Sequence, residues 1–436
     1  MSKMNYLKKM ILICSLLTMT ACGASNSDAT ETQKANPITE DNVISDESVS
    51  SDEKIVISSV SGDVDTSIQS KFAIDLFKEA CLSDIDKNIN TFISPDSVMT
   101  AMGMCANGAN KQTFDEINAV LLKDMTLDDF NSMINTNNMA ANNLQAVKFN
   151  SANSVWVNKN IIDTLRPSFE QTLKESYNAE IEMTPFNMST PTTINEWVSK
   201  NTQGMIPEIV KELPNDAAMY LINAVAFDAE WQTPYTDINI HEHGIFTDEN
   251  GKDKECVMLC STENSYFESK DAIAVIKPYT EQYSFMGILP KTSVSQYVSD
   301  MDISTWTELI HSEINVPVET QIPEFTCIYD ITLSDALQKM GIKEAFTDKA
   351  DFSKMIPPEK KNEISLSIGE VYHKAFIDVN RKGTKAAAAT AIEMTVNSIE
   401  EKPVETKQVY LNKPFVYAIV DNITKRPIFI GTVLHV

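Results

Sequence analysis

The sequence predicts an α+β fold in which strands near the C-terminus complete a sheet region. Two segments there, 413–420 and 427–433, have the composition of β-strands separated by a polar turn. Farther upstream, 371–379 predicts another strand that runs toward a glycine turn. Ser94 and Pro95 predict a helix start, because a serine hydroxyl caps the first turn and proline there costs no hydrogen bond.

Length and composition predict one large domain. The chain has 436 residues, 43% of them hydrophobic, which is enough to fill a sizeable core. Its net charge of −25 argues against nucleic acid or another polyanion as partner, because such partners require a Lys/Arg patch. A hydrolase is the least favoured function, since the chain has neither a Gly-x-Ser-x-Gly elbow nor a phosphate-binding Gly-x-x-x-x-Gly-Lys loop.

The segment from Gly383 to Asn397 is the most informative part of the chain. Alternate residues form one row that is small at first and then bulky and apolar: Thr384, Ala386, Ala388, Thr390, Ile392, Met394 and Val396. Such alternation is typical of a strand with one buried face. The four consecutive alanines at 386–389 favour helix locally. The segment is therefore compatible with two states, and it bridges two sheet regions.

At this point the chain resembles the serpins, protease inhibitors that insert a cleaved loop into their own sheet. The likeness extends over residues 66–436. It rests on motifs in the family's order: Ser94-Pro95-Asp96-Ser97, Asn107-Gly108-Ala109, Asn195-Glu196-Trp197, Thr202-Gln203-Gly204-Met205-Ile206, 221–227 with Trp231, Leu289-Pro290, Ile322-Pro323-Glu324-Phe325, Met340-Gly341-Ile342, Ala350-Asp351-Phe352-Ser353, His373-Lys374-Ala375, Gly383-Thr384 and Lys413-Pro414-Phe415. The resemblance implies a serpin domain over 63–436, with about nine helices packed around three β-sheets and an exposed, mobile reactive-centre loop at about 381–408.

The resemblance also implies a function. An inhibitory serpin is a suicide substrate that traps a serine or cysteine endopeptidase as an acyl complex, when its cleaved loop enters the central sheet. The small residues at Thr384, Ala386 and Ala388 favour trapping, because an entering strand must pass bulky neighbours. The alternative is a non-inhibitory surface-binding protein with the same fold. Neither function needs a catalytic residue, a cofactor or a metal, and we expect a monomer.

Counting forward from the hinge glycine, as in the family, predicts the site of cleavage. The scissile bond then joins Asn397 and Ser398, with Val396 as an alternative and 394–402 as the outer limits. One departure concerns Arg381, which stands where the family usually has an acidic residue, so we expect a rewired salt bridge. The predicted loop hinge consists of Gly383, Thr384, Lys385, Ala386, Ala387, Ala388, Ala389 and Thr390.

Two further groups of residues match positions that control loop insertion in the family. Ser94, Ser97, Asn223 and His373 match the shutter, a hydrogen-bonded polar cluster where strands of the central sheet part. Trp231 matches the aromatic residue of the breach, where insertion begins. Without the resemblance, a helix cap at Ser94 and a simple core role for Trp231 suffice.

The N-terminus predicts export. Lysines precede a short apolar run at 10–17, as in a signal peptide over 1–22. Met19 to Gly23 resembles the bacterial lipobox, in which Cys22 carries the lipid. A cell-surface lipoprotein is therefore expected, with secretion after cleavage near Ala21 as the alternative. Residues 23–62 read as a disordered acidic linker, since the segment up to 54 has no aromatic residue.

The cysteines predict neither a disulfide framework nor a zinc site. Apart from Cys14 and Cys22 in the leader, an odd number remains: Cys81, Cys105, Cys256, Cys260 and Cys327. Cys256 and Cys260 lack nearby ligands, and His241-Glu242-His243 alternates as a strand does.

Overall fold

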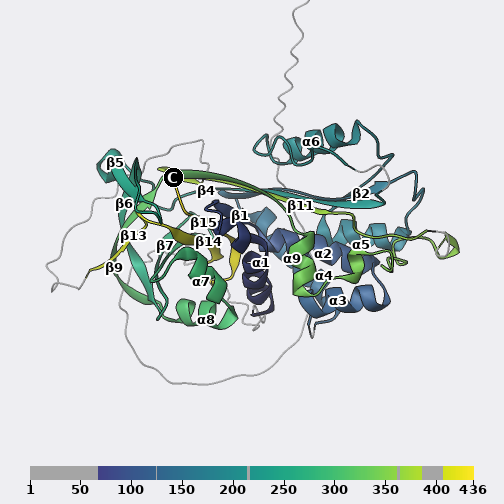
Figure 1. Cartoon of the computed structure of the whole chain (residues 1–436), viewed down its shortest axis with the longest axis horizontal. Helices are drawn as coiled ribbons and strands as arrows, with labels where there is room; N and C mark the ends of the chain where they lie inside the picture. The colour runs from purple at the N-terminus through teal and green to yellow at the C-terminus, as the bar shows by residue number, and fades with distance from the viewer. Residues whose placement is uncertain (1–66, 124, 214–216, 361–363, 385–405) are drawn as a thin grey trace, which may run out of the picture. The chain divides into compact units, whose positions relative to one another are not determined.

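The computed structural model describes residues 67–123, 125–213, 217–360, 364–384 and 406–436 (Figure 1). Within these ranges it contains nine α-helices, which are α1 (Ser67–Ile85), α2 (Pro95–Gly108), α3 (Lys111–Leu121), α4 (Leu127–Asn143), α5 (Pro167–Tyr177), α6 (Thr190–Asn201), α7 (Val294–Asp300), α8 (Ile303–His311) and α9 (Ser334–Met340). Short 3-10 helices are η1 (Asp237–Asn239), η2 (Glu344–Phe346) and η3 (Pro358–Lys360). The α+β class and the number of helices agree with the prediction.

The strands form two hydrogen-bonded sheets. A six-stranded sheet has the order β10 (Phe325–Thr332), β11 (Val371–Asn380), β12 (Gly383–Thr384), β4 (Met219–Glu230), β2 (Val147–Asn158) and β3 (Glu180–Thr184). A nine-stranded sheet has the order β1 (Thr91–Ile93), β15 (Pro427–Val433), β14 (Phe415–Asp421), β8 (Tyr283–Pro290), β7 (Ala272–Pro278), β6 (Asp253–Glu268), β9 (Ile314–Pro323) and β13 (Lys407–Tyr410), with β5 (Ile240–Thr247) beside β6.

Two of the three expected sheets are joined by hydrogen bonds through a shared strand. The long strand β6 pairs with β5 and β9 along most of its length and with β7 near its C-terminal end. Because one continuous strand belongs to both groups, the β5–β6–β9 group and the β7–β8–β14–β15 group join into one nine-stranded sheet. The length of β6, 16 residues, makes this possible.

The six-stranded sheet is covered on both faces (Figure 1). The helix α6 lies on one face, where Trp156, Tyr220 and Ile222 pack with residues of α6 and the segment after it. The helices α2, α4, α5 and α9 lie on the other face, where Leu221 and Phe227 belong to the main core. A strand buried on both sides gains its stability from apolar burial on each face, which explains why every residue from Met219 to Phe227 is buried.

The predicted strands and helix start near the sheet are confirmed. In β11 buried residues alternate strictly with half-buried ones, as period-two patterning requires. The strands β14 and β15 occupy the two predicted C-terminal segments. At the start of α2, the Ser94 hydroxyl accepts a hydrogen bond from the Ser97 N–H and Pro95 takes the first turn.

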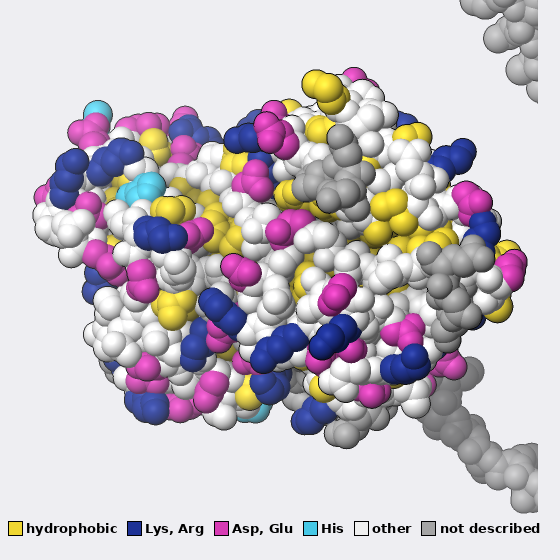
Figure 2. All heavy atoms as spheres, turned by 45° about the vertical axis from the view of Figure 1, so that its right-hand side comes forward, with side chains coloured by type: hydrophobic (Ala, Val, Ile, Leu, Met, Phe, Trp, Pro, Cys, Tyr) yellow, Lys and Arg dark blue, Asp and Glu magenta, His cyan; other side chains and the backbone are white. Residues whose placement is uncertain are grey.

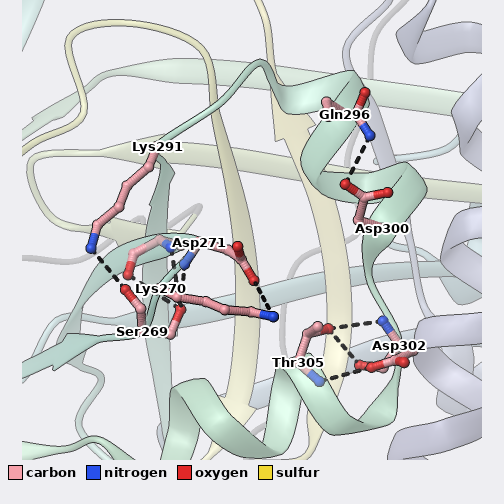
Figure 3. Close-up of polar contacts among 9 residues, drawn as sticks. Ser269, Lys270, Asp271, Lys291, Gln296, Asp300, Asp302 and Thr305 are labelled. Carbon is pink, nitrogen blue, oxygen red and sulfur yellow. Dashed lines mark hydrogen bonds and ion pairs between the residues drawn. The ribbon is translucent and has the colours of Figure 1, made fainter.

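Local polar contacts hold the α7–α8 region (Figure 3). Asp302 and Thr305 form a capping box at the start of α8, in which Asp302 Oδ1 accepts the Thr305 N–H at 2.8 Å. Gln296 Nε2 donates to Asp300 one helical turn later, at 2.8 Å. Lys291 Nζ donates to the Ser269 carbonyl at 2.8 Å, which closes the turn between β6 and β7. These contacts stabilise the two helices and the turn next to them.

The surface carries charges of both signs, and the described cysteines are not paired. On the face that Figure 2 shows, acidic and basic side chains are interspersed. None of the helices in the described ranges has the length and apolar character needed to cross a membrane. The five described cysteines are free thiols. Within the described residues, no cluster of three or more His, Cys, Asp or Glu side chains has metal-binding geometry.

Candidate functional site

The first two residues of the predicted loop segment lie in a gap between β4 and β11. Over 371–376, β11 pairs directly with β4, and the two strands run parallel. Beyond that point β12 lies between them: Thr384 pairs with Val379 on one side and with Ala229 on the other, and both pairings are antiparallel. The two strands are therefore paired directly at one end of the gap, and at the other end they hold Gly383 and Thr384 between them.

Gly383 is required by the close approach of β4. A Cβ atom at this position would lie 2.1 Å from the Ala229 carbonyl oxygen, which is too close for any side chain. Glycine lets the backbones of β12 and β4 meet. The turn out of β11 is fixed on the same side, because the Lys382 carbonyl accepts the Trp231 N–H at 3.0 Å.

Thr384 and Trp231 meet at a shared aromatic residue, Tyr279. The Thr384 side chain is fully buried, and its hydroxyl lies 2.6 Å from the Tyr279 hydroxyl. The Tyr279 ring stacks on Trp231 with a centroid distance of 4.5 Å and an angle of 6°. Trp231 also donates its indole N–H to the Asn380 carbonyl at 2.9 Å. Trp231 thus holds the end of β11 and, through Tyr279, the first buried side chain of the loop.

Arg381 makes the rewired ion pair that its unusual identity predicts. Its backbone N–H donates to Glu324 Oε1 at 3.1 Å, and its guanidinium Nε lies 3.4 Å from the same oxygen. A second carboxylate, that of Glu242, lies 3.6 Å from Nη2. Both contacts are partly exposed, so they contribute little net stability but fix the direction in which the chain leaves β11.

A buried ion pair lies beside the same aromatic group. Lys277 Nζ lies 2.9 Å from Glu263 Oε1, with only 2% of the Lys277 side chain exposed. The ammonium also lies 4.4 Å from the centroid of the Tyr235 ring and 5.5 Å from that of Trp231. Removing one partner of such a pair leaves an uncompensated buried charge, so Lys277 and Glu263 belong to the structural support of the entrance.

The four predicted shutter residues come together halfway along the gap. His373 on β11 and Asn223 on β4 are paired in register, and His373 Nδ1 is hydrogen-bonded to Asn223 Oδ1. From beneath the sheet, Ser94 donates its N–H to His373 Nε2 at 3.1 Å. Asn223 Nδ2 donates to the Ser97 hydroxyl at 2.5 Å. The cluster therefore bridges β4 and β11 and anchors both strands to the start of α2.

A fifth member, Asn153, was missed in the sequence. It pairs in register with Asn223 from the next strand, β2, and its Oδ1 accepts hydrogen bonds from Asn223 Nδ2 at 2.6 Å and from the Ser97 hydroxyl at 3.1 Å. The sequence feature that could have identified Asn153 is its polar side chain between Ser151 and Val155 on the inward-facing row of a strand. Tyr279 carries no comparable signal, because a tyrosine at a strand end is ordinary.

The hydrogen bonds fix the protonation state of His373. Nε2 accepts the Ser94 N–H, so the proton of the neutral ring is on Nδ1 and is donated to Asn223. Burial lowers the pKa of His373 to about 3 from its ordinary value of 6.5. His373 is therefore neutral over the physiological range. Protonation of its Nε2 would remove the acceptor for the Ser94 N–H.

This shift predicts acid destabilisation that depends on His373. Between pH 6.5 and about 3 the unfolded chain binds a proton at His373 and the folded chain does not, so stability falls as the pH falls below 6.5. The expected loss is about 2 kcal/mol at pH 5. His373→Gln keeps an acceptor and a donor without titrating, so its urea-unfolding midpoint should change less between pH 7 and 5 than that of the unmodified protein. Equal pH dependence in the two proteins would contradict the assignment.

Several predicted site residues lie outside the described residues. These are the rest of the hinge, the scissile positions and the lipidation site: Lys385, Ala386, Ala387, Ala388, Ala389, Thr390, Val396, Asn397, Ser398 and Cys22. The structure thus describes the entrance and the shutter of the candidate site, and the sequence alone describes the segment that would enter it.

The chain belongs to the serpin family. Residues 67–436 match the model of that family, described as serpin (serine protease inhibitor). Human alpha-1-antichymotrypsin is 28% identical over 419 residues, covering 92% of this chain and 93% of the relative. An uncharacterised serpin-like protein of Thermococcus kodakarensis is 30% identical over 378 residues, covering 84% of each chain. Members of this family are known as protease inhibitors rather than as catalysts.

Solved structures agree with this assignment. The native state of the thermophilic serpin tengpin is 38% identical, with a TM-score of 0.79 over 92% of this chain and 97% of that one. Its latent state covers 86% of this chain and 98% of that one at 37% identity, with a lower TM-score of 0.73. Thyroxine-binding globulin in complex with thyroxine, 22% identical, has a TM-score of 0.72 over 85% of this chain and 98% of that one. At that identity the likeness shows the fold alone, and the fold carries more than one function.

Proposed function

We propose that this protein is an inhibitory serpin, which traps a serine or cysteine endopeptidase as an acyl complex by inserting its cleaved reactive loop between β4 and β11. The observation that carries the proposal is the position of Thr384. It is already paired with both strands, in the antiparallel direction that the rest of the loop would continue. Insertion would replace a direct parallel pairing with two antiparallel ladders and add a buried strand.

The loop sequence supports trapping over simple binding. Ala386 and Ala388 would follow Thr384 on the row that faces the core, and small side chains pass between closed strands most easily. After acylation the protease nucleophile is bonded to the new C-terminus of the cleaved strand. The length from Thr384 to Asn397, at about 3.3 Å per residue, carries that terminus roughly 46 Å. The bound protease would be moved along the domain before water reaches the acyl bond.

The experiment is a search for a covalent complex. The purified protein is mixed with elastase-like, subtilisin-like, legumain-like and papain-like proteases, boiled in detergent and separated by mass. We expect a band that contains both proteins with at least one active protease, and no such band when its nucleophile is blocked beforehand. Mass spectrometry of the released C-terminal peptide then locates the cut within 394–402. Cleavage in this range by every protease, without any stable complex, would favour the non-inhibitory alternative.

We also propose that the protein acts outside the cell. The support is the sequence of the leader, in which Cys22 follows a lipobox-like stretch, and the acidic linker that would separate the folded domain from a membrane. Cys22→Ser should move the protein from the membrane fraction to the soluble fraction of expressing cells. If the unmodified protein is itself found in the medium, the secreted alternative holds.

A further inference from the structure

A cleft of about 410 Å³ lies between α4 and β2, beside the shutter. Its size is in the range of pockets that bind ligands. Six asparagine side chains line it: Asn137, Asn138, Asn142, Asn153, Asn178 and Asn201. An amide offers both donors and an acceptor in the arrangement that a peptide group needs. Asn137, Asn138 and Asn142 make no side-chain hydrogen bond to another described residue, so their hydrogen-bonding groups are available.

One side of this cleft is a free strand edge. The strand β3 pairs with β2 only over residues 154–158 of β2. Before that point, over 147–153, the only strand partner of β2 in the described ranges is β4, on the opposite side. Just before β3, Asn178 adopts a left-handed conformation (φ 48°), which turns the chain from α5 into β3. On this side of β2, a row of backbone groups about 23 Å long, from residues 147–153, therefore has no strand partner in the described ranges. Unpaired backbone groups of an edge strand are a template for another strand.

Charge limits what can occupy this row. Four charged residues line the cleft, and Arg426 is already paired with Asp96. The other two charged residues, Glu180 and Asp421, are both acidic, so the cleft disfavours an acidic chain. That includes the protein's own segment 23–54, in which eight acidic residues face two lysines. A neutral segment would instead find the asparagines on one side and, on the other, the apolar side chains of Met133 and Phe149.

We propose that this cleft binds an extended, uncharged peptide segment of a partner protein, which pairs with residues 147–153 of β2 as an added strand. Backbone pairing with β2 supplies affinity, and the asparagines of α4 hold the amide groups of the peptide. The proposal does not depend on protease trapping, because the row lies on the far side of β2 from the gap that receives the loop.

The test uses fluorescein-labelled, capped hexapeptides and the purified protein. The neutral probe is Thr-Val-Asn-Val-Thr-Asn, and its acidic match has Glu in place of both Asn. We expect saturable anisotropy with the neutral probe and at least about tenfold weaker binding of the acidic one. Ser151→Trp, at an exposed side chain that lines the cleft, should weaken neutral binding by about tenfold or more. The matched control is Ser304→Trp on α8, an exposed position away from the cleft, which should bind as before.

Melting temperatures of both tryptophan variants show whether they fold. If Ser151→Trp is unstable, Asn138→Ala replaces it, with an expected loss of about threefold to tenfold. The proposal is overturned if the neutral probe does not bind, or if Ser151→Trp binds it as well as Ser304→Trp does, which would place the probe elsewhere, such as between β4 and β11. It is also overturned if a peptide of residues 23–54 or a neutral oligosaccharide, maltohexaose, binds the cleft more tightly than the neutral peptide.

Discussion

Thr384→Arg is expected to turn the protein from an inhibitor into a substrate. The Thr384 side chain is fully buried between β4 and β11, against the hydroxyl of Tyr279. An arginine there would have to bury an unpaired charge, which costs several kcal/mol, or leave the sheet. In the proposed mechanism the cleaved loop enters the sheet from this residue onward, so in the variant it would enter too slowly to precede deacylation. With any protease that forms a complex with the unmodified protein, we expect complex formation to fall at least about tenfold.

The readout is the ratio of covalent complex to cleaved, free protein in detergent gels. Thr384→Ser is the matched control, because it keeps the hydroxyl near Tyr279 and should trap normally. Thr384→Val keeps the shape but loses the hydroxyl, and it leaves Tyr279 without its side-chain partner, so a partial loss is expected. A Thr384→Arg protein that still traps as efficiently as Thr384→Ser would rule out insertion through this entrance.

The parts of the site that sequence could predict are those written in local patterns. The strict alternation of β11 follows from its own residues, and so does the start of α2, where Ser94 and Pro95 supply a cap and a first turn. The resemblance to serpins identified Asn223, His373 and Trp231, which the structure then places at the gap and its entrance. In these cases the residue's own neighbours in the chain carry the information.

The rest depends on register between distant strands. Asn153 meets Asn223 across 70 residues, and Tyr279 meets Thr384 across 105 residues. Which residue faces which is decided when strands pair, and a shift of one residue would turn each side chain to the other face. The joining of two expected sheets has the same origin, because nothing in the sequence of β6 states that both of its ends pair within one sheet.

Cleavage of the loop is expected to raise the melting temperature of the protein strongly. In the proposed mechanism, a cut near Asn397 would free the segment that starts at Thr384 to enter the whole gap between β4 and β11. A central strand gains backbone hydrogen bonds on both edges, at about 1 kcal/mol net each, and buries Ile392, Met394 and Val396 at about 1.5 to 3 kcal/mol each. After the entropy of ordering the segment, a net gain of about 10 kcal/mol corresponds to an increase of about 10 to 15 °C for a domain of this size.

The measurement is a thermal scan of the protein before and after limited proteolysis, with the cut located by mass spectrometry. A cut within the acidic linker at 23–62 serves as the control, since it leaves the gap unchanged and should not alter the melting temperature. Thr384→Arg separates insertion from cleavage itself, because its loop is cut but enters the sheet poorly, so its increase should be much smaller. If the unmodified protein melts at the same temperature after cleavage between 394 and 402, the closed gap between β4 and β11 stores no usable free energy. Trapping by loop insertion would then have no driving force, whatever the resemblance at the hinge.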